Sequence, residues 1–118
     1  MIESCKKKNK HIPEDKILRI VLEILVGLNY IHEFKISHGN LKPSNILVTH
    51  QGRVRISDFG LSKTLRSPKH RANFLYMSPE ILRGENSSTG DIWSLGCIIY
   101  KLCSFQVTVL IIDLVTIL

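Results

Sequence analysis

The chain has 118 residues, of which 44% are hydrophobic and 22% are charged, and this composition excludes an intrinsically disordered segment and favours one globular domain. Sixteen Lys and Arg residues against ten Asp and Glu residues give a net charge of +6. The dense basic run, Lys6, Lys7, Lys8 and Lys10, has no interleaved aromatic residue that could stack on a base. We therefore expect a solvated basic surface, with no nucleic acid as partner.

The cysteines and the apolar segments indicate the cellular setting. Cys5, Cys97 and Cys103 are odd in number and lack metal-ligand spacing, so we expect reduced thiols. The N-terminal end is polar and basic where a secretory signal would be apolar. The apolar run at 107–118 contains Asp113 and is shorter than the roughly 20 residues that span a bilayer. The sequence thus predicts an intracellular, cytoplasmic protein with no membrane partner.

A long helix is predicted to begin at Pro13, because proline suits the first turn and Glu14 and Asp15 match the positive end of the helix dipole. Leu18 and Leu22 widen its apolar stripe beyond one face, so we expect a helix that is buried over much of its circumference. The apolar residues at helical spacing are Ile17, Ile20, Val21, Ile24, Leu25, Leu28 and Ile31.

Two short strands and a second helix follow this helix in the sequence. The segments NILVT (45–49) and RVRIS (53–57) predict a hairpin that has Val54 and Ile56 on one face and arginines on the other. Residues 58–80 lack periodicity and are interpreted as a loop. A second helix is expected from about Asp91 to Ser104. The predicted fold class is α+β, mainly α, with a small β-hairpin. The apolar face expected for the second helix consists of Ile92, Leu95, Gly96, Ile99 and Leu102.

Four ordered motifs give the chain a specific resemblance. HGNLKPSN (38–45) resembles the catalytic loop H-R-D-L-x-x-x-N, DFG (58–60) matches D-F-G, and SPE (78–80) resembles A-P-E. DIWSLG (91–96) is similar to the start of the buried helix that follows these motifs. In this order and spacing, the chain resembles part of the larger, C-terminal lobe of a eukaryotic protein kinase. The resemblance implies a partial kinase domain at 1–104, without the N-lobe, and an apolar tail of unknown role at 105–118.

The resemblance also implies roles for individual residues in Ser/Thr-directed phosphoryl transfer, with ATP and Mg²⁺ as cofactors. Asp58 and Asn45 occupy the positions of the Mg²⁺ ligands, and a hard cation prefers such oxygen donors. Lys42 matches a phosphate-contacting lysine, and Asn40 stands at the position of the catalytic Asp. Without the flanking motifs, an Asn is more often a turn former and an Asp more often a cap.

Departures from the family pattern predict weak or absent activity. Asn40 cannot take up a proton at neutral pH, and Gly39 replaces the Arg that pairs with a phosphorylated loop in many relatives. Asn73 stands where Ser/Thr kinases commonly carry Thr. Nothing upstream resembles the glycine-rich loop, the strand lysine or its glutamate partner, so we expect Mg²⁺-ATP to bind weakly.

Three interpretations stay open at this point. In the first, the chain is part of an incomplete kinase that phosphorylates Ser/Thr in a protein substrate. In the second, it is a pseudokinase module that docks a protein partner. In the third, it is a truncated product without function. Whether it is an enzyme is therefore uncertain from the sequence. Gly39, Asn40 and Asn73 together favour the pseudokinase module.

Overall fold

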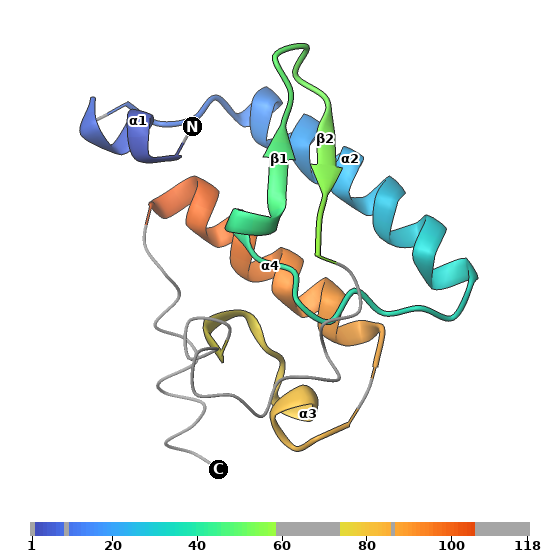
Figure 1. Ribbon diagram of the computed structural model, residues 1–118. Coiled ribbons are helices and arrows are strands. Elements are labelled where there is room, and N and C mark those ends of the chain that lie inside the picture. Colours follow the sequence, from blue (N-terminus) through green and yellow to red (C-terminus); the bar gives the residue numbers. More distant parts are fainter. Residues whose placement is uncertain (1, 9, 59–73, 86, 106–118) are drawn as a thin grey trace.

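A computed structural model describes residues 2–8, 10–58, 74–85 and 87–105. Two long helices form its centre, with a two-stranded hairpin against the first helix (Figure 1). The predicted α+β, mainly α class is confirmed. In chain order the elements are α1 (Ile2–Lys7), α2 (Glu14–Glu33), the short 3₁₀ helix η1 (Pro43–Asn45), β1 (Ile46–Val48), β2 (Val54–Ile56), α3 (Pro79–Leu82) and α4 (Thr89–Ser104).

Helix α2 buries one stripe of side chains and leaves another exposed. Strand β2 and helix α4 pack against one side of it, and that side carries the buried stripe. The opposite stripe is exposed, with Leu22 at 61% and Val26 at 72% of full exposure. The expectation of burial over much of the circumference was therefore wrong, because no described element covers this second side. The buried residues are Ile17, Ile20, Ile24, Leu28 and Ile31.

The hairpin has the predicted faces and is attached to α2 by one carboxylate. Its strands are antiparallel and pair Ile46 with Ile56. Val54 and Ile56 are partly buried against the core while the arginines are exposed, as predicted. Glu23 of α2 accepts a hydrogen bond from the Val54 backbone N–H at 2.7 Å, and this bond holds the pKa of Glu23 below its usual value. Helix α2 therefore fixes where the strand after the turn lies.

Helix α4 confirms the predicted second helix, although its buried face differs from the predicted one. Ile92 and Gly96 are exposed, whereas Leu95, Ile98 and Leu102 pack in the core with α2. The helix begins two residues before Asp91, and this places the Asp91 carboxylate inside the first turn and in the protein interior. The start of α4 therefore faces the segment that follows α2.

The predicted loop at 58–80 is only partly within the described residues. Its described end is more regular than expected, because Phe74, Leu75 and Tyr76 form one 3₁₀ turn and α3 begins at Pro79. Phe59, Gly60 and Asn73 lie outside the described residues. None of the described helices is long and apolar enough to cross a membrane.

Candidate functional site

The centre of the candidate site is the buried carboxylate of Asp91, which is 1% exposed. Its two oxygens accept hydrogen bonds from the backbone N–H groups of His38 at 2.8 Å and Gly39 at 2.9 Å. Nε2 of His32, in the last turn of α2, lies 2.8 Å from the same carboxylate. The first turn of α4 therefore fixes the backbone at the start of the HGNLKPSN segment. Sequence reasoning identified Asp91 as a buried helix start but missed His32.

The imidazole of His38 connects this segment to the end of the hairpin. Its Nε2 lies 2.9 Å from the Ser57 carbonyl oxygen, and its Nδ1 lies 3.2 Å from the Asn40 backbone nitrogen. A carbonyl can only accept and an amide N–H can only donate, so this arrangement requires a neutral ring that carries its proton on Nε2. Burial lowers the pKa of His38, although the Ser57 carbonyl and the carboxylates of Asp91 and Asp58 partly oppose the shift.

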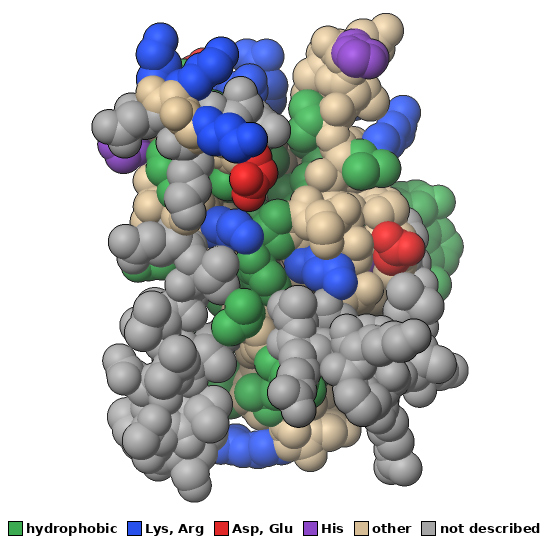
Figure 2. Space-filling model, turned by 60° about the vertical axis from the view of Figure 1, so that its left-hand side comes forward, with side chains coloured by type: hydrophobic (Ala, Val, Ile, Leu, Met, Phe, Trp, Pro, Cys, Tyr) green, Lys and Arg blue, Asp and Glu red, His purple; other side chains and the backbone are tan. Residues whose placement is uncertain are grey.

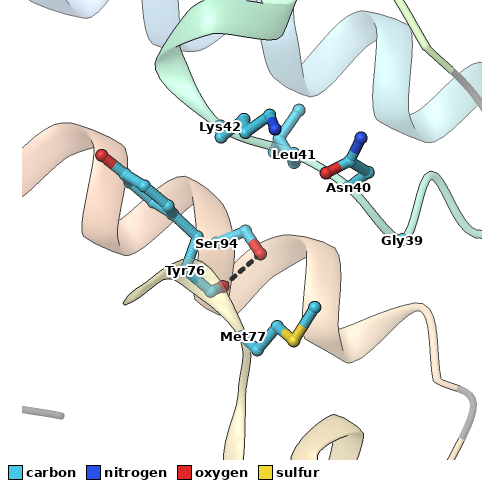
Figure 3. Close-up of a pocket in the computed structure, with 7 residues that line it drawn as sticks. All are labelled: Gly39, Asn40, Leu41, Lys42, Tyr76, Met77 and Ser94. Atoms are coloured by element: carbon cyan, nitrogen blue, oxygen red, sulfur yellow. Dashed lines mark hydrogen bonds between the residues drawn. The ribbon is translucent and has the colours of Figure 1, made fainter. Parts of the chain in front are cut away.

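Asn40 follows this histidine and faces a small cavity. The cavity is about 10 Å³, roughly the volume that one water molecule needs. The side-chain oxygen of Asn40 is buried there and accepts no hydrogen bond from the residues that the structure describes. Figure 3 shows Asn40 and Lys42 on one side of the cavity and Tyr76 and Ser94 on the other. An amide oxygen in this position is an acceptor for an incoming donor.

The far wall of the cavity is fixed by a hydroxyl from α4. Ser94 Oγ lies 2.6 Å from the Tyr76 carbonyl oxygen (Figure 3). It also lies 2.9 Å from the Gly90 carbonyl oxygen. This contact joins α4 to the segment before α3, and Lys101 Nζ donates to Tyr76 Oη at 3.3 Å. Tyr76 and Ser94 were not predicted as site residues. The DIWSLG resemblance was the available signal for Ser94.

Asn45 and Asp58 are both hydrogen-bonded to one residue, Ser57. The Ser57 backbone N–H donates to the Asn45 carbonyl at 2.9 Å, and Ser57 Oγ donates to the Asp58 carboxylate at 3.0 Å. Asn45 is buried, and its Nδ2 donates to the Asn40 carbonyl at 2.8 Å. The side-chain oxygen of Asn45 takes no part in this hydrogen bond. Asp58 is exposed and has a left-handed backbone, with φ of 63°.

The donor chemistry of these two residues fits Mg²⁺. One carboxylate and one amide oxygen suit a cation that usually keeps waters and takes its remaining ligands from substrate phosphates. Among the described residues, no group of three or more His, Cys, Asp or Glu side chains is placed to hold a metal ion. Asn45 and Asp58 would therefore hold Mg²⁺ only together with further oxygens, such as those of water and substrate phosphates.

A comparison with known proteins identifies a matching family and individual relatives of this chain. The protein kinase domain family matches residues 1–110. Serine/threonine-protein kinase Nek3 of Mus musculus is 39% identical over 106 residues, or 85% of this chain and 21% of that protein. Mitogen-activated protein kinase kinase 1 of Arabidopsis thaliana is 46% identical over 102 residues, or 80% of this chain and 29% of that protein. The chain thus spans less than a third of the length of these two relatives. It belongs to the protein kinase domain family.

Proposed function

We propose that this chain carries the catalytic-loop part of an ATP-dependent site that transfers a phosphoryl group to Ser or Thr of a protein, with weak or absent activity. The observation that carries the proposal is the hydrogen-bond network joining Asp91, His38 and Ser57, because Asn40, Asn45 and Asp58 are attached to it. Phosphoryl transfer depends mainly on positioning and on neutralising phosphate charge, and such a network supplies positioning. Membership of the protein kinase domain family supports the same assignment.

Each residue then has a distinct role. Asn45 and Asp58 would hold Mg²⁺, which when bound neutralises charge on the phosphate oxygens. The ammonium group of Lys42 would contact the transferred phosphate. The buried amide oxygen of Asn40 would orient the substrate hydroxyl through one water molecule, because the cavity beside it has room for a water but not for a peptide side chain. His38 stays neutral and holds the Asn40 backbone.

Asn40 limits the rate because its amide cannot take the proton from the substrate hydroxyl. Loss of a general base typically costs roughly 10² to 10⁴ in rate. The loose transition state of phosphoryl transfer places the cost toward the lower end of that range, because little proton transfer has occurred when the phosphoryl group moves. Weak activity, rather than a different reaction, is the consequence we infer.

The test is phosphoryl transfer to a generic Ser/Thr peptide by a chimera that adds a complete kinase N-lobe and the following C-lobe helices to residues 1–104. Asn40→Asp should raise the rate about 10²-fold or more, and Asp58→Ala in that variant should abolish the gain. Asn29→Asp, an exposed change on α2, is the matched control and should leave the rate unchanged. Equal rates with and without the Asn40→Asp substitution would contradict the role given to Asn40.

A second candidate function is a pseudokinase module that binds a protein without catalysis. The specific observation in its favour is that the Asn40 side-chain oxygen is buried against α4 in a cavity too small for a peptide side chain. If no chimera transfers phosphate, with or without Asn40→Asp, while the chain still binds a protein partner, this second function replaces the first.

A further inference from the structure

A larger groove lies beside the catalytic loop, on the side of the molecule shown in Figure 2. Its volume is about 830 Å³, within the range of roughly 300 to 1,000 Å³ that is typical of ligand sites. Pro43 and Ser44 of η1 form the edge nearest the candidate site. Its apolar floor comes from α2, β1 and α4 and consists of Ile20, Ile46, Val48, Ile98 and Leu102.

Two lysines form the rim of this groove, which we call the lysine-rimmed groove. Lys16 comes from the first turn of α2 and Lys101 from the last turn of α4. Among the residues that the structure describes, neither ammonium group lies within ion-pair distance of a carboxylate. In Figure 2, hydrophobic side chains lie between Lys and Arg side chains on this face. Glu3 of α1 is the one carboxylate among the described lining residues, so positive charge predominates.

The position of Lys16 is not explained by helix electrostatics. A cation in the first turn of a helix lies near the positive end of the helix dipole, where it is disfavoured. Lys101 is at the favourable end of α4, but its contact with Tyr76 Oη connects it to the wall of the Asn40 cavity. The groove thus combines an apolar floor with cationic groups at two separate helix ends.

We propose that the lysine-rimmed groove binds an extended segment of the protein substrate in which apolar side chains alternate with acidic ones. This inference rests on the proposed function, because a protein that accepts phosphate must be held beside the catalytic loop. Apolar side chains would cover the floor, and carboxylates would pair with Lys16 and Lys101. The net charge of +6 would favour the approach of an acidic segment. The groove would present a neighbouring Ser or Thr to Asn40.

The test is fluorescence anisotropy with the full chain, in the absence of nucleotide, using a labelled peptide of alternating Leu and Glu. We expect a dissociation constant in the micromolar range, and at least about tenfold weaker binding when Lys replaces Glu in the peptide. High salt should weaken binding because the charges on the rim are screened. Equal binding of the two peptides would overturn the proposal.

Variants locate the binding on the chain. Lys16→Glu and, separately, Lys101→Met should each weaken binding of the acidic peptide about tenfold, while circular dichroism verifies that the fold is retained. Lys35→Glu is the matched control, since Lys35 is exposed and does not line the groove, and it should bind like the unmodified chain. Loss of binding in Lys35→Glu, or unchanged binding in both rim variants, would assign the peptide to another surface and overturn the proposal.

Other occupants would give different results. Tighter binding of a peptide with the sequence of residues 107–118 than of the acidic peptide would assign the groove to the chain itself and overturn the proposal. A dimer in light scattering that Lys16→Glu dissociates, with no peptide binding, would assign it to a second copy and also overturn it. Because the assay needs no nucleotide, binding that persists in chimeras without phosphoryl transfer would separate failure of the proposed function from failure of this groove.

Discussion

At the scale of single residues, the geometry of the candidate site depends most on one buried carboxylate. Asp91 is the acceptor for two loop amides and the partner of His32, and its carboxylate lies in the protein interior. A buried donor that loses its acceptor costs about 1 to 3 kcal/mol. The shape of the segment around His38 therefore depends on its contacts with α4 as much as on its own sequence.

Asp91→Ala should lower the free energy of unfolding by roughly 3 kcal/mol or more, because three hydrogen bonds lose their acceptor at once. Urea denaturation followed by circular dichroism measures the change. Asp15→Ala, at an exposed position in the first turn of α2, is the matched control and should cost less than about 1 kcal/mol. A similar loss in both variants would contradict the role of Asp91.

His38 should make stability depend on pH in a defined direction. Its pKa is lowered in the folded chain, so the unfolded chain takes up the proton first as pH falls through about 6.5. Stability is therefore lost as pH falls below about 6.5, by at most about 1.4 kcal/mol per pH unit. In thermal melts at a series of pH values around 6.5, the melting temperature should depend less on pH for His38→Gln than for the unmodified chain. His50→Gln, at the exposed hairpin turn, should show the same pH dependence of the melting temperature as the unmodified chain.

At the scale of elements, the contact between α3 and α4 depends on a close approach at Gly90. A Cβ atom at this position would lie 2.7 Å from Cγ1 of Ile81 and 3.3 Å from Oγ of Ser78. Gly96, further along the same helix, would meet nothing within 4 Å. Packing therefore requires glycine at position 90 of α4 but leaves room for a side chain at position 96.

Gly90→Ala should lower the free energy of unfolding by about 1 to 3 kcal/mol, because the added methyl group overpacks the contact with Ile81. Gly96→Ala should raise it by about 0.5 to 1 kcal/mol, because alanine loses less conformational freedom in a helix. Denaturant unfolding of the two variants measures both signs in the same element. A stabilising Gly90→Ala would show that α3 moves away from α4 without cost.

Prediction from sequence succeeded where local periodicity determines the structure. The two long helices and the hairpin follow from apolar spacing and turn residues, and the motifs indicated Asn40, Asn45 and Asp58 as candidate site residues. The buried face of α4 was predicted only in part: Leu95 and Leu102 are buried as predicted, but the contacts made by Asp91 and Ser94 orient the helix so that Ile92 faces solvent. The pairing of His32 with Asp91 joins positions 59 residues apart, and no local pattern encodes such a contact.

At the scale of the whole molecule, α2 presents an exposed apolar stripe that no described element covers. Its members recur every four residues and so form one continuous line along the helix. Exposed patches of this kind favour association. The stripe consists of Leu18, Leu22, Val26, Tyr30 and Phe34, all of them more than half exposed.

The isolated chain should therefore self-associate, and size-exclusion chromatography with light scattering should report a mass above that of the monomer. Leu22→Lys combined with Val26→Lys should reduce this mass, because two charges interrupt the stripe. Asn29→Lys adds a charge at an exposed position of α2 outside the stripe and should leave the mass unchanged. A monomer in the unmodified chain would contradict the prediction.

The contacts of Asp91 also determine when the segment at 38–45 can take its shape during protein synthesis. The loop amides of His38 and Gly39 bind a carboxylate that lies 53 and 52 residues later in the chain. A ribosome adds about 5 to 20 residues per second, so the loop leaves the exit tunnel several seconds before its acceptor exists outside it. During that interval the loop amides have no Asp91 carboxylate to bind. The segment at 38–45 can therefore take its described shape only after the first turn of α4 has been synthesised.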